Sequence, residues 1–353
     1  MIFRCKAPVR ICDLGGWTDT WFAQSGCILN IAVYPCVEVS VKVRKRVEND
    51  SHFIIRAENY GETLHFPRTA KAGQDEEMFG KYALLRVACE AFSLPEALCF
   101  EVSIFSEAPA GASIGTSASV SVAILGALDL FAQSQASPYQ IAQKAHHLES
   151  EVLGWQSGVQ DQFAAVHGGI SFIEVIRYPD AKISPVEISP SLFNELESRL
   201  LLVYLGKPHC SSEVHNRVIA KMQSNPGYRK HLQALAACAD KGREALLKGD
   251  LEAFGRTMID NTEIQQSMDA DLVGTQARKL ISLAKDFGAC GYKVNGAGGD
   301  GGSITLLLPP NLDLKHKWME AIRSTHPEFT VISVKIAPVG FQRWRAFSDF
   351  RPS

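Results

Sequence analysis

Apolar and polar residues alternate over residues 37–44, where four valines are separated by polar side chains. A period of two predicts a half-buried β-strand, because successive side chains point to opposite faces of a sheet. The turn signal Asn49-Asp50-Ser51 follows, and residues 52–58 are predicted to return as the partner of the first strand.

Helical and strand patterns then succeed one another up to residue 153. Residues 75–93 have apolar positions at helical spacing, whereas residues 99–106 alternate again and predict a strand. A Gly/Ser-rich loop at 109–117 comes next, and the apolar run 120–133 predicts a helix directly behind it. A further helix is expected over 137–153, because its Ser-Pro start places proline in the first turn, where it is tolerated.

The second half of the chain also mixes the two patterns. We expect strands at 170–176 and 199–205, mainly helices over 211–287, a strand pair within 291–308, a helix near 313–324 and a strand at 329–336. The 353 residues exceed a typical single core. The Pro- and Asp-containing stretch 177–185 suggests a boundary between two domains, 1–180 and 181–353.

The composition narrows the class of protein. Apolar residues make up 46% and charged residues 21%, with a formal net charge of −2, so the basic excess of a nucleic-acid or anionic-membrane binder is missing. The sequence has no apolar run long enough for a membrane span. Nine scattered cysteines without a C-x-x-C pair are typical of reduced thiols. We therefore expect a cytoplasmic protein with no nucleic-acid or membrane partner.

The loop at 109–119 carries the strongest chemical signal. Small residues allow a ligand to approach the backbone, and free N–H groups before a helix favour an anion. The candidate phosphate-binding residues are Pro109, Gly111, Ala112, Ser113, Gly115, Thr116, Ser117 and Ala118. The alternative is a small-residue turn before a buried helix. The loop lacks the Walker pattern.

A second glycine-rich stretch at 296–301 formally fits G-x-G-x-x-G. The residues after it predict a strand, so a bound pyrophosphate would lack the helix N-terminus that dinucleotide sites provide. We therefore do not interpret this stretch as a dinucleotide site.

Three separated segments resemble the GHMP kinases. Lys6-Ala-Pro-Val-Arg10 with Leu14-Gly-Gly-Trp-Thr-Asp19 is similar to the opening motif of the sugar kinases, the loop at 109–119 to the phosphate loop, and residues 293–302 to the third motif. The opening also resembles the kinase part of fucokinases and the heptose-7-phosphate kinases. The resemblance extends over nearly the whole chain.

This resemblance implies an α+β fold with two lobes, an N-terminal lobe like ribosomal protein S5 and a ferredoxin-like C-terminal lobe, with the active site between them. It implies transfer of the γ-phosphoryl group of ATP, with Mg²⁺, to a sugar hydroxyl, by analogy the anomeric one. A heptose 7-phosphate or a fucose-like sugar is the expected acceptor, and a monomer or homodimer the expected assembly. Kinases of other alcohols, a decarboxylase and a non-catalytic binding protein are the alternatives.

The resemblance also assigns roles to single residues. Asp161 would meet the acceptor hydroxyl and Arg10 would support it, while Ser117 and Glu149 would hold Mg²⁺. The alternatives are a helix-capping or loop aspartate, a surface arginine and a surface glutamate.

The acceptor pocket is expected around five residues, which are Gly16, Trp17, Thr18, Asp19 and Gly298. Asp19 would accept hydrogen bonds from sugar hydroxyls, and Gly16 replaces an acidic residue of galactokinases, which disfavours galactose. Trp17 and Trp21 would either pack on the sugar or line the core. Lys207, His209, Ser211 and Ser212 form a candidate second anion site, with helix capping as the alternative explanation of the serines.

Overall fold

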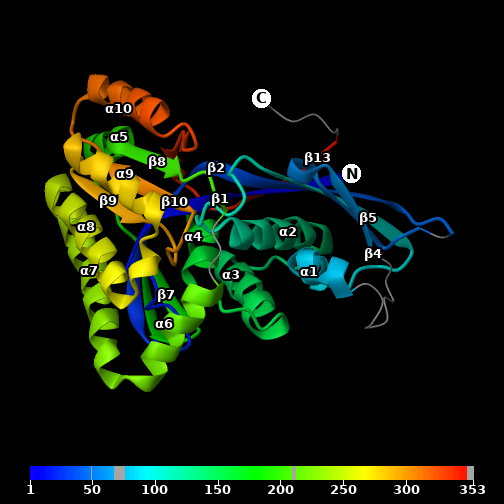
Figure 1. The fold of residues 1–353 in the computed structure, drawn as a ribbon. Coiled ribbons are helices and arrows are strands. Elements are labelled where there is room, and N and C mark those ends of the chain that lie inside the picture. Colours follow the sequence, from blue (N-terminus) through cyan, green and yellow to red (C-terminus); the bar gives the residue numbers. More distant parts are fainter. Residues whose placement is uncertain (49, 67–75, 209–211, 348–353) are drawn as a thin grey trace.

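The computed structural model of the protein describes residues 1–48, 50–66, 76–208 and 212–347. This part of the chain forms two β-sheets with helices packed against them (Figure 1). The mixed α and β content confirms the predicted fold class, whereas the likeness of each lobe to a particular fold stays a prediction. None of the helices in these ranges has the length and apolar character needed to cross a membrane.

The first sheet contains nine strands, six of them in the order β13-β1-β2-β5-β3-β4 along its main path. Off the main path, β6 and β12 pair with β2, whereas β7 pairs with β6. The strands are β1 (Ile2–Leu14), β2 (Gly26–Lys45), β3 (Phe53–Ala57), β4 (Glu62–Phe66), β5 (Leu98–Ser106), β6 (Ile170–Arg177), β7 (Asp180–Pro185), β12 (Lys335–Ile336) and β13 (Gln342–Ala346). The alternating valines of β2 are buried as predicted up to Val41.

The prediction that residues 52–58 pair with the valine strand is wrong. The strand at 53–57 forms, as β3, but it pairs in parallel with β5 and antiparallel with β4. β2 pairs with β5 instead, which therefore lies between β2 and β3. The turn after β2 reverses the chain, and the apolar β5 fills the position between the two strands because it can form ladders on both of its edges.

The second sheet is antiparallel, with the order β11-β8-β10-β9. Its strands are β8 (Leu200–Tyr204), β9 (Gly291–Val294), β10 (Ser303–Leu307) and β11 (Thr330–Ile332). The predicted strand at 329–336 is divided, because β11 ends in this sheet and β12 joins β2 of the first sheet. Alternation alone cannot show such a change of partner. The predicted strand pair within 291–308 is confirmed, and β10 also confirms a strand directly after the second glycine stretch.

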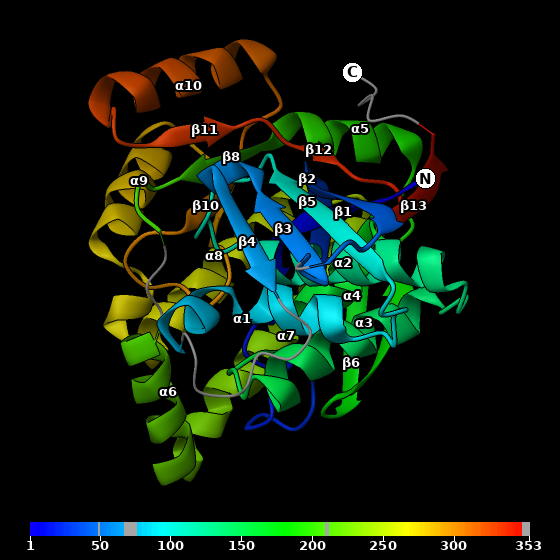
Figure 2. The ribbon, with the colours of Figure 1, turned by 90° about the vertical axis from the view of Figure 1, so that its right-hand side faces the viewer.

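The helices confirm most of the predicted pattern. They are α1 (Glu76–Glu90), α2 (Thr116–Ala132), α3 (Pro138–His147), α4 (Gln160–His167), α5 (Pro190–Arg199), α6 (Ser212–Ser224), α7 (Arg229–Lys248), α8 (Leu251–Met268), α9 (Thr275–Asp286) and α10 (Leu312–Thr325), with short 3₁₀ turns at Glu58–Tyr60, Pro226–Tyr228 and Ala270–Leu272 and a π turn at Leu148–Val152. Helices α1, α2 and α3 lie along one face of the first sheet, and α10 lies beside β11 (Figures 1 and 2). Helix α2 begins four residues earlier than the apolar run predicts, so Thr116 and Ser117 belong to its first turn.

The strands of the first sheet come from both sides of residue 180. β7 begins at Asp180 and pairs with β6, and β12 and β13 return from the end of the chain to pair with β2 and β1. The division into domains at residue 180 stays a prediction, and the hairpin of β6 and β7 spans that position.

Candidate active site

A cavity of about 420 Å³ brings together segments that are far apart in the sequence. Its wall is formed by the end of β1 and the segment after it, the loop before α2, the π turn with residues 155–158, the start of α4, one side of α6 and residues 296–297. The predicted residues among its lining are Arg10, Trp17, Asp19, Gly111, Ala112, Ser113, Gly115, Thr116, Ser117, Glu149 and Asp161. The remaining predicted residues, Pro109, Ala118, Gly16, Thr18 and Gly298, do not line it.

The loop before α2 has the backbone geometry of an anion cradle. Gly111 and Gly115 have φ of 71° and 75°, and Gly115 is the residue directly before the helix. No side chain caps this helix end, so its first N–H groups have no side-chain acceptor. The hydroxyls of Ser113 and Thr116 are buried without a protein partner. These donors fit the oxygens of a phosphate group.

Gly115 also allows the loop to approach the start of α4. A Cβ atom at this position would lie 3.2 Å from Cγ of Asp161 and 3.4 Å from Cγ of Arg10. Ser113, by contrast, adopts a φ of 59° as a residue with a side chain, which is a strained conformation. Its carbonyl oxygen accepts a hydrogen bond from Nη1 of Arg10 at 2.6 Å, and this bond holds the strained residue in place.

Arg10 and Asp161 form a two-point ion pair in the cavity. Nε of Arg10 donates to Oδ1 of Asp161 at 2.8 Å, and Nη2 donates to Oδ2 at 3.2 Å. Burial alone would lower the pKa of Arg10, but the charges of Asp161, Asp13 and Asp19 raise it above its usual value. The guanidinium is therefore a fixed positive charge beside Asp161.

Asp19 lies on the same cavity wall with only 2% of its surface exposed. Its Oδ2 accepts a hydrogen bond from the backbone N–H of Gln160 at 3.0 Å. Burial raises the pKa of Asp19 to about 6, although this N–H lowers it in part. A Cβ at Gly158 would lie 2.1 Å from the carboxylate, so glycine is needed there for the close approach.

Thr18 and Gly16 support the segment rather than line the cavity. The hydroxyl of Thr18 donates to the carbonyl oxygens of Gly15 at 2.7 Å and Cys27 at 3.1 Å, which holds the turn against β2. A Cβ at Gly16 would lie 2.8 Å from Oδ2 of Asp13. Both residues therefore support the segment that lines the cavity without lining it themselves.

Glu149 is 4% exposed, so it is not the surface carboxylate that its late position in a helix could suggest. It lies in the π turn at Leu148–Val152, and such turns are frequent at functional sites. Its Oε2 accepts hydrogen bonds from Ser157 and from Nε2 of Gln162, both at 2.8 Å, whereas its buried Oε1 has no partner. Burial raises the pKa of Glu149 to about 7.

Glu149 and Ser117 fit the donor set of a Mg²⁺ site. Both line the cavity, both present oxygen atoms, and the free Oε1 of Glu149 is the kind of acceptor that a hard cation satisfies. Magnesium is commonly held by one or two such groups together with water and substrate phosphates. When bound it would neutralise charge on the phosphate oxygens, next to the loop before α2.

The aromatic residues near the cavity have mixed roles. Trp17 lines the cavity but is largely buried and packs with Val218, Met222 and Leu235, so the core interpretation holds for most of its ring. Trp21 and Trp155 also line the cavity. Trp21 stays a candidate for contact with the apolar face of a sugar ring, whereas Trp155 was not singled out from the sequence.

Only a short part of the third glycine-rich motif (residues 293–302) reaches the cavity. Gly296 and Ala297 line it, whereas a Cβ at Gly298 would lie 2.1 Å from the carbonyl oxygen of Leu272. Asp300 is exposed and lies 3.6 Å from the ammonium of Lys207, so its charge is directed to solvent. His209 and Ser211 of the candidate second anion site lie outside the described residues.

Sequence reasoning missed several polar residues of the cavity. Asp13, Ser157 and Gln160 line it, and Gln162 holds Glu149 from behind. A charged residue inside the apolar segment Ile11–Leu14 was the available signal for Asp13, since carboxylates are rarely buried without a role.

A family model confirms the class of protein that this fold and site define. Residues 81–169, which include the loop before α2, Glu149 and Asp161, match the GHMP kinases N terminal domain. The matched residues resemble that domain, and the rest of the chain lies outside the match. The solved D-glycero-D-manno-heptose 1-phosphate kinase from Bacteroides thetaiotaomicron has the same fold, with a TM-score of 0.74, 22% identity and coverage of 98% of this chain and all of that one.

Two curated relatives are similar along most of this chain. It is 24% identical to the D-glycero-alpha-D-manno-heptose 7-phosphate kinase of Campylobacter jejuni, over 97% of this chain and 98% of the relative. It is 26% identical to the bifunctional fucokinase/GDP-fucose pyrophosphorylase of Arabidopsis thaliana, over 93% of this chain. The aligned part makes up 32% of the Arabidopsis protein.

Proposed function

We propose that this protein is an ATP-dependent sugar kinase that transfers the γ-phosphoryl group to a sugar hydroxyl. The observation that carries the proposal is the Arg10–Asp161 pair beside the loop before α2, in one cavity with Glu149 and Ser117. Phosphoryl transfer requires a cradle for the phosphates, a cation beside them and a group at the attacking hydroxyl. The cavity offers residues suited to each requirement.

Asp161 is the group proposed to meet the acceptor hydroxyl. Its carboxylate orients the hydroxyl and accepts its proton as the new bond to phosphorus forms. Arg10 holds the carboxylate at two points, so it fixes the direction of the lone pairs and stabilises negative charge on the group in transfer. The backbone N–H groups at the start of α2 would hold the phosphate end, and the side chains of Ser117 and Glu149 would hold the Mg²⁺ that neutralises its charge.

The acceptor is proposed to be polyhydroxylated, because Asp19 presents a buried carboxylate to the cavity. The named activities of the relatives support a sugar: one is a kinase of heptose 7-phosphate and another has a fucokinase part. By analogy, we propose that the anomeric hydroxyl is phosphorylated and that a sugar 1-phosphate is released. A heptose 7-phosphate is the first candidate and a fucose-like sugar the second.

The test is release of ADP from Mg-ATP with a panel of free hexoses, heptoses and their terminal phosphates, followed by phosphorus NMR of the products. We expect one member to respond strongly and to give an anomeric phosphate signal. Turnover only with non-sugar alcohols, or release of CO₂ from a carboxylated acceptor, would contradict the proposal. ATP binding without turnover on any acceptor would indicate a binding protein instead.

A further inference from the structure

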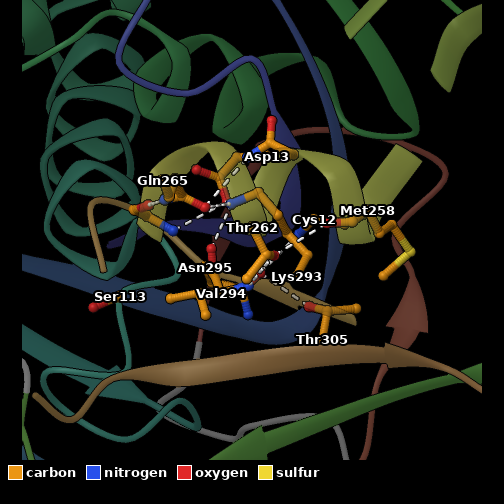
Figure 3. Close-up of polar contacts among 12 residues, drawn as sticks. Cys12, Asp13, Ser113, Met258, Thr262, Gln265, Lys293, Val294, Asn295 and Thr305 are labelled. Atoms are coloured by element: carbon orange, nitrogen blue, oxygen red, sulfur yellow. Dashed lines mark hydrogen bonds and ion pairs between the residues drawn. The ribbon is translucent and has the colours of Figure 1, made fainter. Parts of the chain in front are cut away.

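Asp13 and Lys293 form a buried ion pair at the wall of the cavity. Lys293 of β9 is completely buried, and its Nζ lies 3.5 Å from Oδ1 of Asp13 in β1. The same Nζ donates to Oε1 of Gln265 at 3.0 Å and to the carbonyl oxygen of Val294. Figure 3 shows Lys293 pointing toward Asp13 and Gln265. The three donors of the ammonium thus have three acceptors.

The two oxygens of Asp13 have different surroundings. Oδ1 accepts from the backbone N–H of Gly296 at 3.0 Å and from Lys293, and so joins β1 to the third glycine-rich motif. Oδ2 is buried and accepts no hydrogen bond from the protein. A buried carboxylate oxygen without a donor is costly. The contacts that connect Asp13 to Gly296 and Lys293 use Oδ1 alone, so they do not explain why Oδ2 is buried without a donor.

Gly16 packs closely against this free oxygen. A Cβ at Gly16 would lie 2.8 Å from Oδ2 of Asp13 and 3.6 Å from Nε2 of Gln160. The φ of Gly16 is outside the left-handed region, so the backbone itself does not demand glycine there. Oε1 of Gln160 is a second buried acceptor without a partner, and both side chains line the cavity.

We infer that Oδ2 of Asp13 accepts a hydrogen bond from a hydroxyl of the acceptor other than the one that Asp19 holds. This inference rests on the proposed function and deepens it, because it makes Asp13 a residue that determines which polyols bind. Among the described residues of the cavity lining, the carboxyl groups of Asp13, Asp19, Glu149 and Asp161 then stand against one guanidinium, that of Arg10. Such a wall suits the uncharged hydroxyl-bearing part of an acceptor and repels a phosphate, so a terminal phosphate of the acceptor would point away from it.

The test combines variants of this site with deoxy analogues of the acceptor found by the panel above. Asp13→Asn keeps the volume but removes the charge, and Gly16→Ala places a methyl group against Oδ2 without changing Asp13. In each variant we expect KM for the acceptor to rise at least about tenfold, as the loss of a hydrogen bond to a charged group implies. KM for ATP should stay unchanged.

The decisive measurement is the coupling between variant and analogue. Wild type should discriminate against the deoxy sugar that lacks the contacted hydroxyl, and both variants should lose most of that discrimination. The other analogues should be penalised equally in all three proteins. Asp19→Asn is the matched comparison, and it should lose discrimination against a different analogue.

Two further variants separate binding from loosening of the fold. Asp13→Asn leaves Lys293 without its counter-ion. The double variant Asp13→Asn/Lys293→Met removes both buried charges, and its discrimination among the deoxy analogues is measured in the same way. Thr305→Val breaks a hydrogen bond to Asn295 in the same buried network but away from the cavity lining. It should leave discrimination among the analogues as in wild type.

The outcomes distinguish the inference from the proposed function. An active wild type whose variants keep every deoxy penalty would overturn the inference alone, because Asp13 would then act only through the fold. A wild type that phosphorylates no sugar would overturn both. Collapse of one penalty in Asp13→Asn and in Gly16→Ala would support the inference and identify the hydroxyl.

Discussion

Arg10 and Asp161 are 151 positions apart in the sequence, yet they share two hydrogen bonds, from Nε at 2.8 Å and from Nη2 at 3.2 Å. The third nitrogen of Arg10 bonds the backbone of the loop before α2. One side chain therefore connects the proposed acceptor end of the cavity with the proposed phosphate end. A lysine could not replace it, because an ammonium lacks the planar fork that makes these contacts simultaneously.

Replacement of Asp161 by asparagine should abolish most of the turnover. The amide cannot accept the hydroxyl proton, so we expect kcat to fall by about 10²- to 10⁴-fold. Nucleotide binding, measured by calorimetry, should be retained because Asp161 lies outside the phosphate loop. Unchanged turnover would show that Asp161 is only a structural partner of Arg10.

Gly115→Ala should lower activity by crowding Asp161. The new Cβ would lie 3.2 Å from Cγ of Asp161, and a displacement of about 1 Å at a reacting group costs about a hundredfold in rate. Gly61→Ala is the matched control, because Gly61 has a similar φ of 63° and nothing within 4 Å of the added Cβ. Both variants should lose about 1 kcal/mol of unfolding free energy. If both keep full turnover, the approach of the loop to Asp161 is not required.

Glu149→Gln should weaken the dependence on magnesium. The amide keeps the shape but loses the charge, so the Mg²⁺ concentration at half-maximal turnover should rise at least about tenfold, the lower limit seen even for groups behind the metal ligands. The thermal stabilisation of the protein by Mg²⁺ with an ATP analogue should fall in parallel. Glu151→Gln changes an exposed neighbour in the same π turn and should match wild type. Equal Mg²⁺ responses in the two variants would exclude Glu149 as a ligand.

Asp19 should make stability fall as pH rises. Its pKa is raised from 3.8 to about 6 in the folded protein, so the folded state holds the proton more tightly than the unfolded state. The stability linked to this proton is present in full below about pH 4 and is lost as pH rises through about 6, a total of about 3 kcal/mol. Denaturant unfolding across this range should show a loss in wild type that is smaller by about this amount in Asp19→Asn, where only the contribution of other carboxyl groups with a raised pKa, such as Glu149, remains.

Ionisation of Asp19 should also affect acceptor binding. Binding should strengthen as pH rises, whereas the free energy of unfolding falls. Ionised Asp19 accepts hydrogen bonds better than the protonated acid, so KM for the acceptor should decrease as pH rises through about 6. In Asp19→Asn the contribution of this group should disappear. A wild-type profile identical to that of the variant would place Asp19 outside the acceptor site.

The sequence by itself determined the local elements and the chemistry of single segments. Alternation in 37–44 predicted β2, helical spacing predicted α1, and the small residues at 109–117 with the apolar run behind them predicted a loop directly before a helix, because these properties depend on neighbours in the chain. The resemblance added Arg10, Glu149 and Asp161, which all line the cavity.

Only the tertiary structure decided which strands pair and which oxygens are left without donors. β5 lies between β2 and β3, and the stretch at 329–336 divides between two sheets, because ladder partners are chosen by packing across long distances in the chain. The free oxygens of Asp13 and Glu149 likewise follow from contacts with Lys293 and Ser157, which come from other segments. Burial and hydrogen bonding of a carboxylate are properties of its surroundings. The residue type therefore predicts a negative charge, but it does not predict which oxygen atom remains free to bind a substrate.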